Sequence, residues 1–155
     1  MKVIRLLFAT GLVLAISSLG MAQEEVKRTA TIIQLEGTVE VMAPKKAWKP
    51  ANVGMVLNQA DVIRTQAKSS TTLSLDGAGE TATVIVKGNS QLMLADLVTN
   101  KSDNSQKTLL DLALGEILIK AKKIHSEKTS FEVKTPTSIV AVRGTTFSVT
   151  VEARE

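Results

Sequence analysis

The sequence predicts an all-β fold made of many short strands. Apolar and polar residues alternate with a period of two over much of the chain, and several segments are rich in β-branched residues. Turn signals such as Asp-Gly and Gly-Asn separate these segments roughly every 8–12 residues. This spacing is typical of a β-sandwich or roll, and it also fits a short β-solenoid-like stack, so the sequence leaves both architectures open.

The first 22 residues have the features of a secretory signal peptide. Lys2 and Arg5 precede an apolar run over residues 6–19, and Gly20 and Ala22 put small residues at the positions that favour cleavage after Ala22. The run of about 14 residues is shorter than the ~20 that a membrane-spanning helix needs. We therefore expect a periplasmic or secreted protein, without a stable membrane span after cleavage, whose residues 23–155 form one domain.

The first half of the mature chain alternates in short runs. Residues 30–35 and 39–41 predict a hairpin with Gly37 in its turn. Pro44 to Ala51 reads as a loop that carries the only tryptophan. Further strands are expected over residues 53–57, 61–65 and 71–75.

Glycine-containing turns also divide the middle of the chain. Strands are expected over residues 81–87 and 90–98, with a turn at Gly88-Asn89 between them, and residues 100–107 form a polar loop tip. The leucines of residues 109–120 would also suit a helix. The central Gly115 and the alternation on both sides of it favour a strand.

The C-terminal region predicts three more strands. Residues 129–134 alternate, with Phe131 and Val133 directed inward, and the run breaks at Thr135-Pro136. The last two strands, residues 138–142 and 147–151, flank Arg143-Gly144.

Composition excludes several classes of site. There is no cysteine and only one histidine, so disulfides, thiolate metal sites and histidine clusters are ruled out. Gly77 to Ala82 matches a loose G-x-G-x-x-A pattern, but the strand-like residues after it indicate a turn and not a dinucleotide site. His125 has no visible partner for acid–base chemistry. We expect no catalytic residues, no cofactor and no metal.

Charge gives little support to nucleic-acid binding. The 19 basic and 15 acidic residues give a net charge of +4, and removal of Lys2 and Arg5 lowers it to 17 − 15 = +2. A protein that binds nucleic acid electrostatically is far more basic, and aromatic residues make up only 3% of the chain. Nucleic acid is therefore not an expected partner.

One group of basic residues is a candidate anion-binding patch. Its members are Lys120, Lys122, Lys123 and Lys128. Such a patch would suit an anionic envelope component, for example a polysaccharide or a peptidoglycan fragment. Lysines of this kind also serve as solvated guards of strand edges, and the sequence alone does not separate the two roles.

The most specific motif lies near the C-terminus. Residues 135–147 read TPTSIVAVRGTTF, and this resembles the signature of the FecR domain: a Thr-Pro, a short apolar strand, then Arg-Gly-Thr-x-Phe. Upstream of this motif, further blocks of the family occur in the family's order at residues 53–54, 60–65, 70–77 and 114–119. The resemblance therefore spans roughly residues 39–151. The signature residues here are Thr135, Pro136, Arg143, Gly144, Thr145 and Phe147.

The physical roles of these residues can be anticipated. Pro136 ends a strand, Gly144 permits a backbone conformation that other residues resist, and Phe147 enters the core. Arg143 is expected to clamp its turn by hydrogen bonds to loop carbonyls or a carboxylate, with partner binding as the alternative.

The resemblance implies a stand-alone, exported version of a periplasmic sensor domain. Proteins of the ferric-citrate regulator type add a cytoplasmic anti-sigma segment and a membrane span, which this sequence is not expected to carry. We expect a non-catalytic module that acts through contacts with an envelope protein, with a link to iron-uptake regulation by analogy alone. Strand addition at a sheet edge is one route to such contacts.

Overall fold

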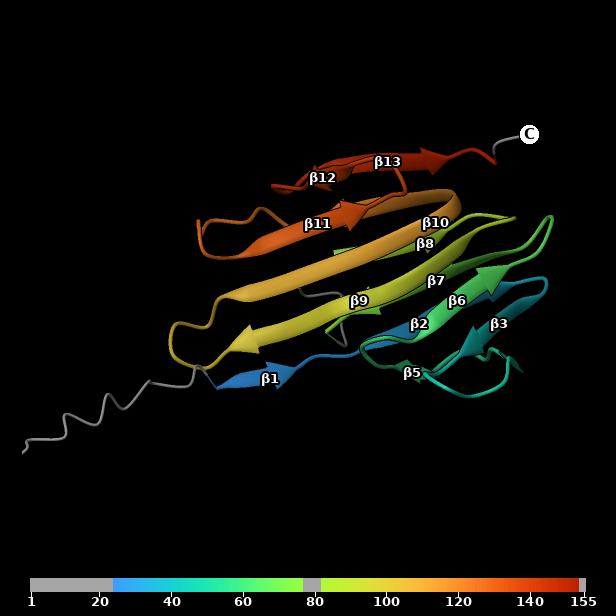
Figure 1. Ribbon diagram of the computed structural model, residues 1–155, viewed down its shortest axis with the longest axis horizontal. Helices are drawn as coiled ribbons and strands as arrows, with labels where there is room; N and C mark the ends of the chain where they lie inside the picture. The colour runs from blue at the N-terminus through green and yellow to red at the C-terminus, as the bar shows by residue number, and fades with distance from the viewer. Residues whose placement is uncertain (1–23, 77–81, 154–155) are drawn as a thin grey trace, which may run out of the picture.

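The computed structural model describes residues 24–76 and 82–153, and these residues form strands and connecting turns without a helix (Figure 1). The strands are β1 (Glu25–Lys27), β2 (Ala30–Glu36), β3 (Val39–Met42), β4 (Lys49–Pro50), β5 (Val56–Leu57), β6 (Val62–Thr65), β7 (Ser70–Leu75), β8 (Ala82–Val86), β9 (Gln91–Asn100), β10 (Gln106–Ala121), β11 (Ser130–Lys134), β12 (Ile139–Ala141) and β13 (Thr146–Val151). The predicted all-β class is confirmed. No described helix exists that is long and apolar enough to cross a membrane.

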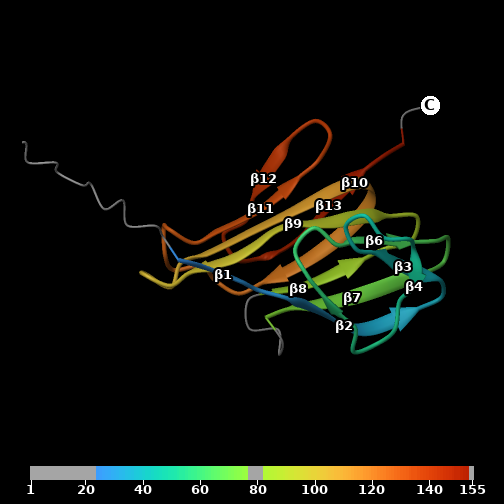
Figure 2. The ribbon, with the colours of Figure 1, turned by 60° about the horizontal axis from the view of Figure 1, so that its bottom comes forward.

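The strands form one sheet that curls back on itself into two layers. The first layer has the order β12-β11-β10-β9-β6-β3-β4, and the second has the order β13-β10-β8-β7-β2-β5. Strand β10 belongs to both layers, because its first half pairs with β9 and β11 and its second half with β8 and β13. Figure 2 shows β9 to β11 lying over β8, β7 and β2.

Pairing directions decide between the two architectures that the sequence left open. β10 and β11 run parallel, and every other described strand pair is antiparallel. A solenoid-like stack would pair its successive coils in parallel. The described residues therefore form a roll.

The bend in β10 is fixed at one glycine. The pairing of β10 with β9 shifts between Leu112 and Leu114, and Gly115 follows with a φ of 93°. A Cβ on Gly115 would lie 2.5 Å from the Cα of Ser90, which is closer than real Cβ atoms approach backbone. The Ser90 hydroxyl accepts a hydrogen bond from the Glu116 amide at 3.0 Å. Only glycine suits this position, and the polar link to Ser90 holds the bend in place.

The core lies between the two layers. Its buried side chains run from Ala30 to Val149 and form one hydrophobic cluster, in which Leu73, Leu94, Leu112 and Ile117 are fully buried. Along β10, Ile117 and Ile119 face this core whereas Lys120 is exposed. The period-two alternation thus identified most of the inward face of this strand, but Leu114, which alternates with Leu110 and Leu112 in the sequence, is 38% exposed at the bend.

One predicted pairing is wrong. β2 and β3 were expected to form a hairpin, but β2 pairs with β7 and β5 whereas β3 pairs with β6 and β4. Gly37 does make the turn, with a φ of 71°. The chain uses this turn to pass from one layer to the other, so the two strands become neighbours in sequence without sharing a ladder.

Most other expected segments match observed strands. The ambiguous residues 109–120 fall within β10, and the expected loop tip at 100–107 joins β9 to β10. The break at Thr135-Pro136 follows the last residue of β11. The expected signal peptide and residues 77–81 of the glycine pattern lie outside the described residues.

Candidate functional site

Both layers end in an unpaired strand on the same side of the roll. β12 pairs with β11 and β13 pairs with β10, and no described strand pairs with the other edge of either. We call this side, formed by β12 and β13, the open end; it lies at the top of Figure 1. The C-terminal signature of residues 135–147 spans β12 and reaches into β13, so it builds most of the open end.

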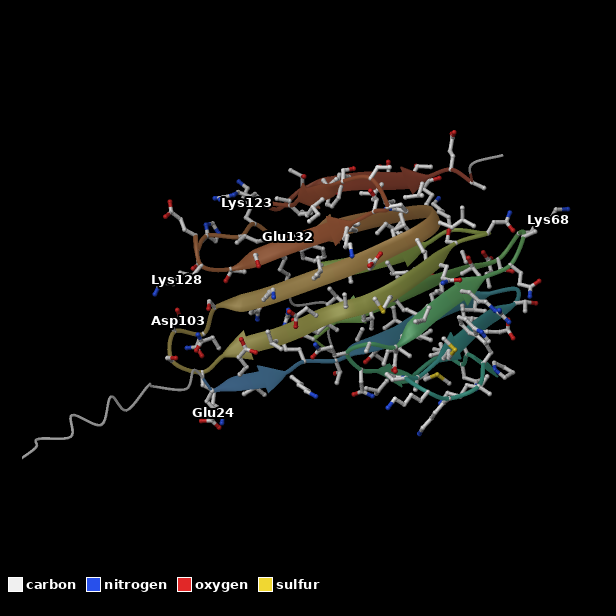
Figure 3. The ribbon with its side chains drawn as sticks, viewed as in Figure 1. Glu24, Lys68, Asp103, Lys123, Lys128 and Glu132 are labelled. Carbon is white, nitrogen blue, oxygen red and sulfur yellow. The ribbon has the colours of Figure 1, made fainter. Side chains whose placement is uncertain are left out.

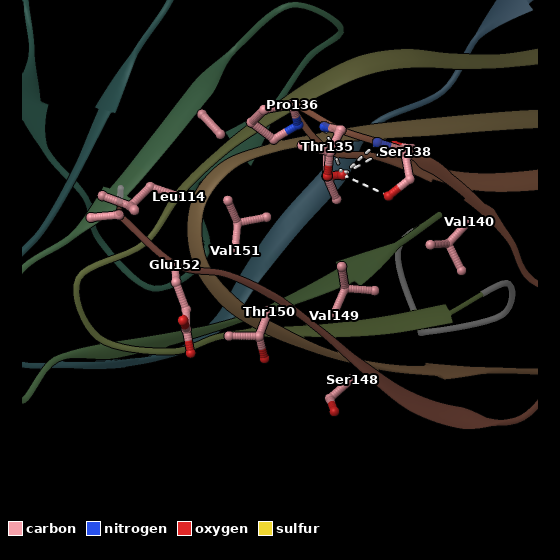
Figure 4. Close-up of a pocket in the computed structure, with 13 residues that line it drawn as sticks. Leu114, Thr135, Pro136, Ser138, Val140, Ser148, Val149, Thr150, Val151 and Glu152 are labelled. Atoms are coloured by element: carbon pink, nitrogen blue, oxygen red, sulfur yellow. Dashed lines mark hydrogen bonds between the residues drawn. The ribbon is translucent and has the colours of Figure 1, made fainter. Parts of the chain in front are cut away.

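A groove of about 850 Å³ separates the two edges (Figure 4). One wall comes from the turn between β11 and β12, including Pro136, together with Val140 of β12, and the other comes from residues 148–153 of β13 and its continuation. Leu114, at the bend of β10, also lines the groove. Leu114 is 38% exposed and Ile139 is 63% exposed, so large apolar side chains meet solvent at this end. Apolar side chains such as Leu114 and polar side chains such as Thr150 line the groove in similar measure.

Thr135 fixes the turn that forms one wall. Its amide donates a hydrogen bond to the Ser138 carbonyl at 2.8 Å, and its Oγ1 accepts one from the Ser138 amide at 3.0 Å. Pro136 and Thr137 occupy the two positions between them and are exposed. Because proline has a fixed φ and no N–H, this tight turn ends β11 and brings β12 back beside it.

Gly144 connects the two edge strands at a point of close backbone contact. Its φ is 89°, and a Cβ there would lie 2.5 Å from the Cα of Lys123 and 2.7 Å from the Lys122 carbonyl oxygen. The next residue, Thr145, accepts a hydrogen bond from the Ala121 amide at 3.2 Å through its carbonyl. The chain therefore passes from one layer to the other at Gly144 by lying directly against the end of β10.

The outward groups of β13 follow from this ladder. Thr145 faces Ala121 across a hydrogen-bonded pair, and antiparallel pairs alternate between bonded and non-bonded. Phe147 and Val149 therefore direct their backbone groups toward β10. The N–H and C=O groups of Thr146, Ser148 and Thr150 point outward, so the open edge offers three residues for further strand pairing.

Comparison with known proteins identifies the chain. The model of the family described as FecR protein matches residues 61–155, which is more than half of the chain. The chain belongs to the FecR family. No curated protein and no solved structure matches it. The match begins just before β6, so it includes the bend of β10 and the whole open end but not β2 to β5.

Within the FecR signature, Gly144 and Phe147 have the environments expected for them. Gly144 has the positive φ that the sequence predicted. Phe147 is partly buried and packs against the hydrophobic core. Thr145 contributes its carbonyl to the ladder, and its side chain is exposed.

The expected role of Arg143 as a turn clamp is wrong. Arg143 is exposed, and no residue in the described parts of the chain pairs with its guanidinium. The turn is held by the backbone bond at Thr145 and the fit of Gly144 against Lys123. The other interpretation of the signature arginine, binding to a partner, is the one that its exposure permits.

The arginine that does clamp the fold is Arg28, which the sequence did not single out. Its side chain is 7% exposed and makes an ion pair with Asp76 at 2.5 Å. Its Nε donates to the Val98 carbonyl at 3.3 Å, and its Nη2 donates to Thr108 Oγ1 and to the Lys107 carbonyl. Arg28 therefore ties β9 and β10 of one layer to the end of β7 in the other.

The structure brings together three of the four lysines of the candidate patch and places Lys128 elsewhere. Lys120, Lys122 and Lys123 follow one another at the end of β10, and all three are exposed without an ion pair to a described residue. Lys128 is instead paired with Asp103 at 3.2 Å, at the tip between β9 and β10 (Figure 3). Hydrogen bonds from Ser105, with a further contribution from Lys128, lower the pKa of Asp103 to about 2.

The described part of the chain holds no cluster of metal ligands. No group of three or more His, Cys, Asp or Glu side chains lies close enough to hold a metal ion there. His125 is exposed beside Lys122 and Lys123 in a shallow hollow of about 370 Å³.

Proposed function

We propose that this chain is an exported binding module of the FecR sensor type, and that it recognises an envelope protein by adding a strand of that protein to β13. The observation that carries the proposal is the open end itself. The FecR signature ends there in an edge with outward backbone groups, beside a groove lined by both apolar and polar side chains. An extended segment would gain ladder hydrogen bonds from β13 and bury alternate side chains in the groove.

Export is the part of the proposal that rests on residues 1–22. Cleavage after Ala22 would leave a mature chain beginning at Gln23. The intact mass of the protein from a fractionated cell tests this directly. A mass matching residues 23–155 in the periplasmic or extracellular fraction supports the proposal, and an uncut chain in the membrane fraction contradicts it.

Strand addition is tested by crosslinking in cells. A photo-crosslinking amino acid at Ser148 is compared with one at Lys49, which lies in the edge strand on the opposite side of the roll. We expect a discrete protein adduct from position 148 alone. The variant Thr150→Pro removes an outward N–H without removing a bond to β10, because proline is tolerated on an edge strand where its nitrogen faces solvent.

The matched control for that variant is Thr150→Ala, which keeps the N–H. The proposal predicts that the adduct disappears in Thr150→Pro and persists in Thr150→Ala, with both variants folded by circular dichroism. An adduct that is equal in both variants would show that β13 pairing is not the mode of binding. Recovery of an iron transporter or its regulator in the adduct would support the link to iron uptake, which here rests on the family alone.

An anionic envelope polysaccharide is the second candidate, because Lys120, Lys122 and Lys123 lie close together at the end of β10 and none forms an ion pair with a described residue. Such binding would weaken steeply as salt is raised. It would also be indifferent to Thr150→Pro, since it needs no ladder hydrogen bonds. Those two outcomes together distinguish it from strand addition.

A further inference from the structure

The open edge carries charge at one end that no ion pair with a described residue neutralises. Arg143 and Lys120, Lys122 and Lys123 are exposed, and no described residue forms an ion pair with them. Their backbones lie together, because Gly144 contacts Lys122 and Lys123 and because Thr146 pairs with Lys120. We call these four residues the basic corner.

The basic corner lies at the beginning of β13. At the other end of the same edge the charge is reversed, because Glu152 follows the last residue of the strand and lines the groove (Figure 4). The sides of the groove between these ends are formed by Val149, Thr150 and Val151, which carry no charge. The edge is therefore polarised along its length, from basic at residue 143 to acidic at residue 152.

We infer that the segment added to β13 is an acidic-ended strand: alternating apolar residues that fill the groove, followed by carboxylates that face the basic corner. This inference rests on the proposed function and specifies its partner. An antiparallel segment places its C-terminal end beside the beginning of β13, so the carboxylates follow the apolar residues. Antiparallel pairing is the arrangement of every described strand pair but one.

Charge complementarity selects both the partner and its direction. Like charges placed side by side oppose binding, so an acidic group at the wrong end would lie beside Glu152. A cation that already forms an ion pair with another residue of the chain would not select a ligand in this way. At the opposite side of the roll Arg64 is already paired with Glu40 at 2.7 Å, which leaves that guanidinium less able to recruit a ligand.

Three labelled peptides test the inference against the full mature chain. The first is TVTVTVDED, the second is DEDTVTVTV, and the third is the neutral TVTVTVNQN. We expect the first to bind about tenfold more tightly than either of the others at low salt, the combined effect of a few exposed charge pairs. Raising the salt to ~0.5 M should remove most of this preference, because exposed charges are then screened.

Substitutions assign the preference to the basic corner. The double variant Lys123→Gln/Arg143→Gln should reduce the preference to about twofold. The matched control Lys45→Gln/Lys46→Gln removes two exposed lysines from the loop before β4 and should leave the preference intact. Binding of all three peptides should be lost in Thr150→Pro.

The outcomes separate this inference from the proposed function. Equal binding of the three peptides, still abolished by Thr150→Pro, would overturn the acidic-ended strand and leave strand addition standing. Tighter binding of DEDTVTVTV would overturn the antiparallel direction. Binding of dextran sulfate that depends on Arg143 but not on Thr150, without binding of any peptide, would overturn both in favour of a polyanion surface.

Discussion

The edge strands at the two ends of the roll differ in length and in their protection against pairing. At one end, which we call the blunt end, the edge strands β4 and β5 have two residues each, and β4 contains Pro50. Arg64 lies 4.1 Å from the ring centre of Trp48 and is paired with Glu40. At the open end β13 has six residues, and the nearby cations of the basic corner are unpaired within the described residues.

Short edge strands and proline are devices that prevent strands of other molecules from pairing. The blunt end uses both, whereas the open end uses neither along β13. The chain therefore protects its edge strands against further pairing at the blunt end but does not protect β13 in the same way. The FecR match includes the unprotected end and omits β4 and β5, so the part of the chain that the family model describes is the part that leaves an edge available.

The largest effect is expected at the contact that holds the two layers together, because the open end depends on the distance between the layers. Arg28→Ala should lower the free energy of unfolding by about 3 kcal/mol, since it removes a buried cation together with its ion pair and its hydrogen bonds to both layers. Arg143→Ala should change it by less than about 0.5 kcal/mol, as expected for an exposed side chain without partners. Urea unfolding of both variants measures the difference. Equal losses would restore Arg143 as a structural clamp.

Glycines at the two ends give the next comparison. Gly144 at the open end and Gly54 at the blunt end both have positive φ, at 89° and 85°. A Cβ on Gly144 would clash with Lys123, whereas a Cβ on Gly54 would meet nothing within 4 Å. Gly144→Ala should therefore cost about 3 kcal/mol of stability, from strain plus overlap, and Gly54→Ala about 1 kcal/mol from strain alone. Similar melting temperatures for the two variants would contradict the close contact at Gly144.

These contrasts also show how far the sequence could carry the structure. Strand positions, the inward faces of β10 and β11, and the need for glycine at residue 144 follow from alternation and turn chemistry, which are local. The separation of β2 from β3 did not follow, because the partner of a strand depends on residues far along the chain. Arg28 was missed for the same reason: its side-chain partners lie 48 to 80 residues away. The clamp role predicted for Arg143 was wrong because the motif does not determine which residues surround its side chain.

A smaller effect is expected at the turn that forms one wall of the groove. Thr135→Val should cost about 1–2 kcal/mol, because the Oγ1 that accepts from the Ser138 amide is lost in a buried position. The neighbouring Thr137→Val is the matched control, because Thr137 is exposed. We also expect Thr135→Val to weaken peptide binding at the open end while Thr137→Val does not. Unchanged stability in Thr135→Val would mean that Pro136 and the backbone bond from the Thr135 amide to the Ser138 carbonyl hold the turn without the hydroxyl.

The smallest effect concerns the paired charge at the blunt end. The hydrogen bond from Arg64 lowers the pKa of Glu40 below its ordinary value of 4.5. Because this pKa is lowered in the folded state, the stabilisation it gives is present above about pH 4.5 and is lost as the pH falls through the lowered pKa.

A carboxyl NMR titration of Glu40 in Arg64→Gln should show its pKa return toward 4.5. In Trp48→Ala the pKa of Glu40 should rise by less than in Arg64→Gln, because Glu40 keeps its partner while Arg64 loses the ring that it lies over. An unchanged pKa in Arg64→Gln would mean that the blunt end does not hold its cation. The contrast between a paired cation at the blunt end and unpaired cations in the basic corner would then be lost, whereas the direction of the added strand, which depends on Glu152, would be unaffected.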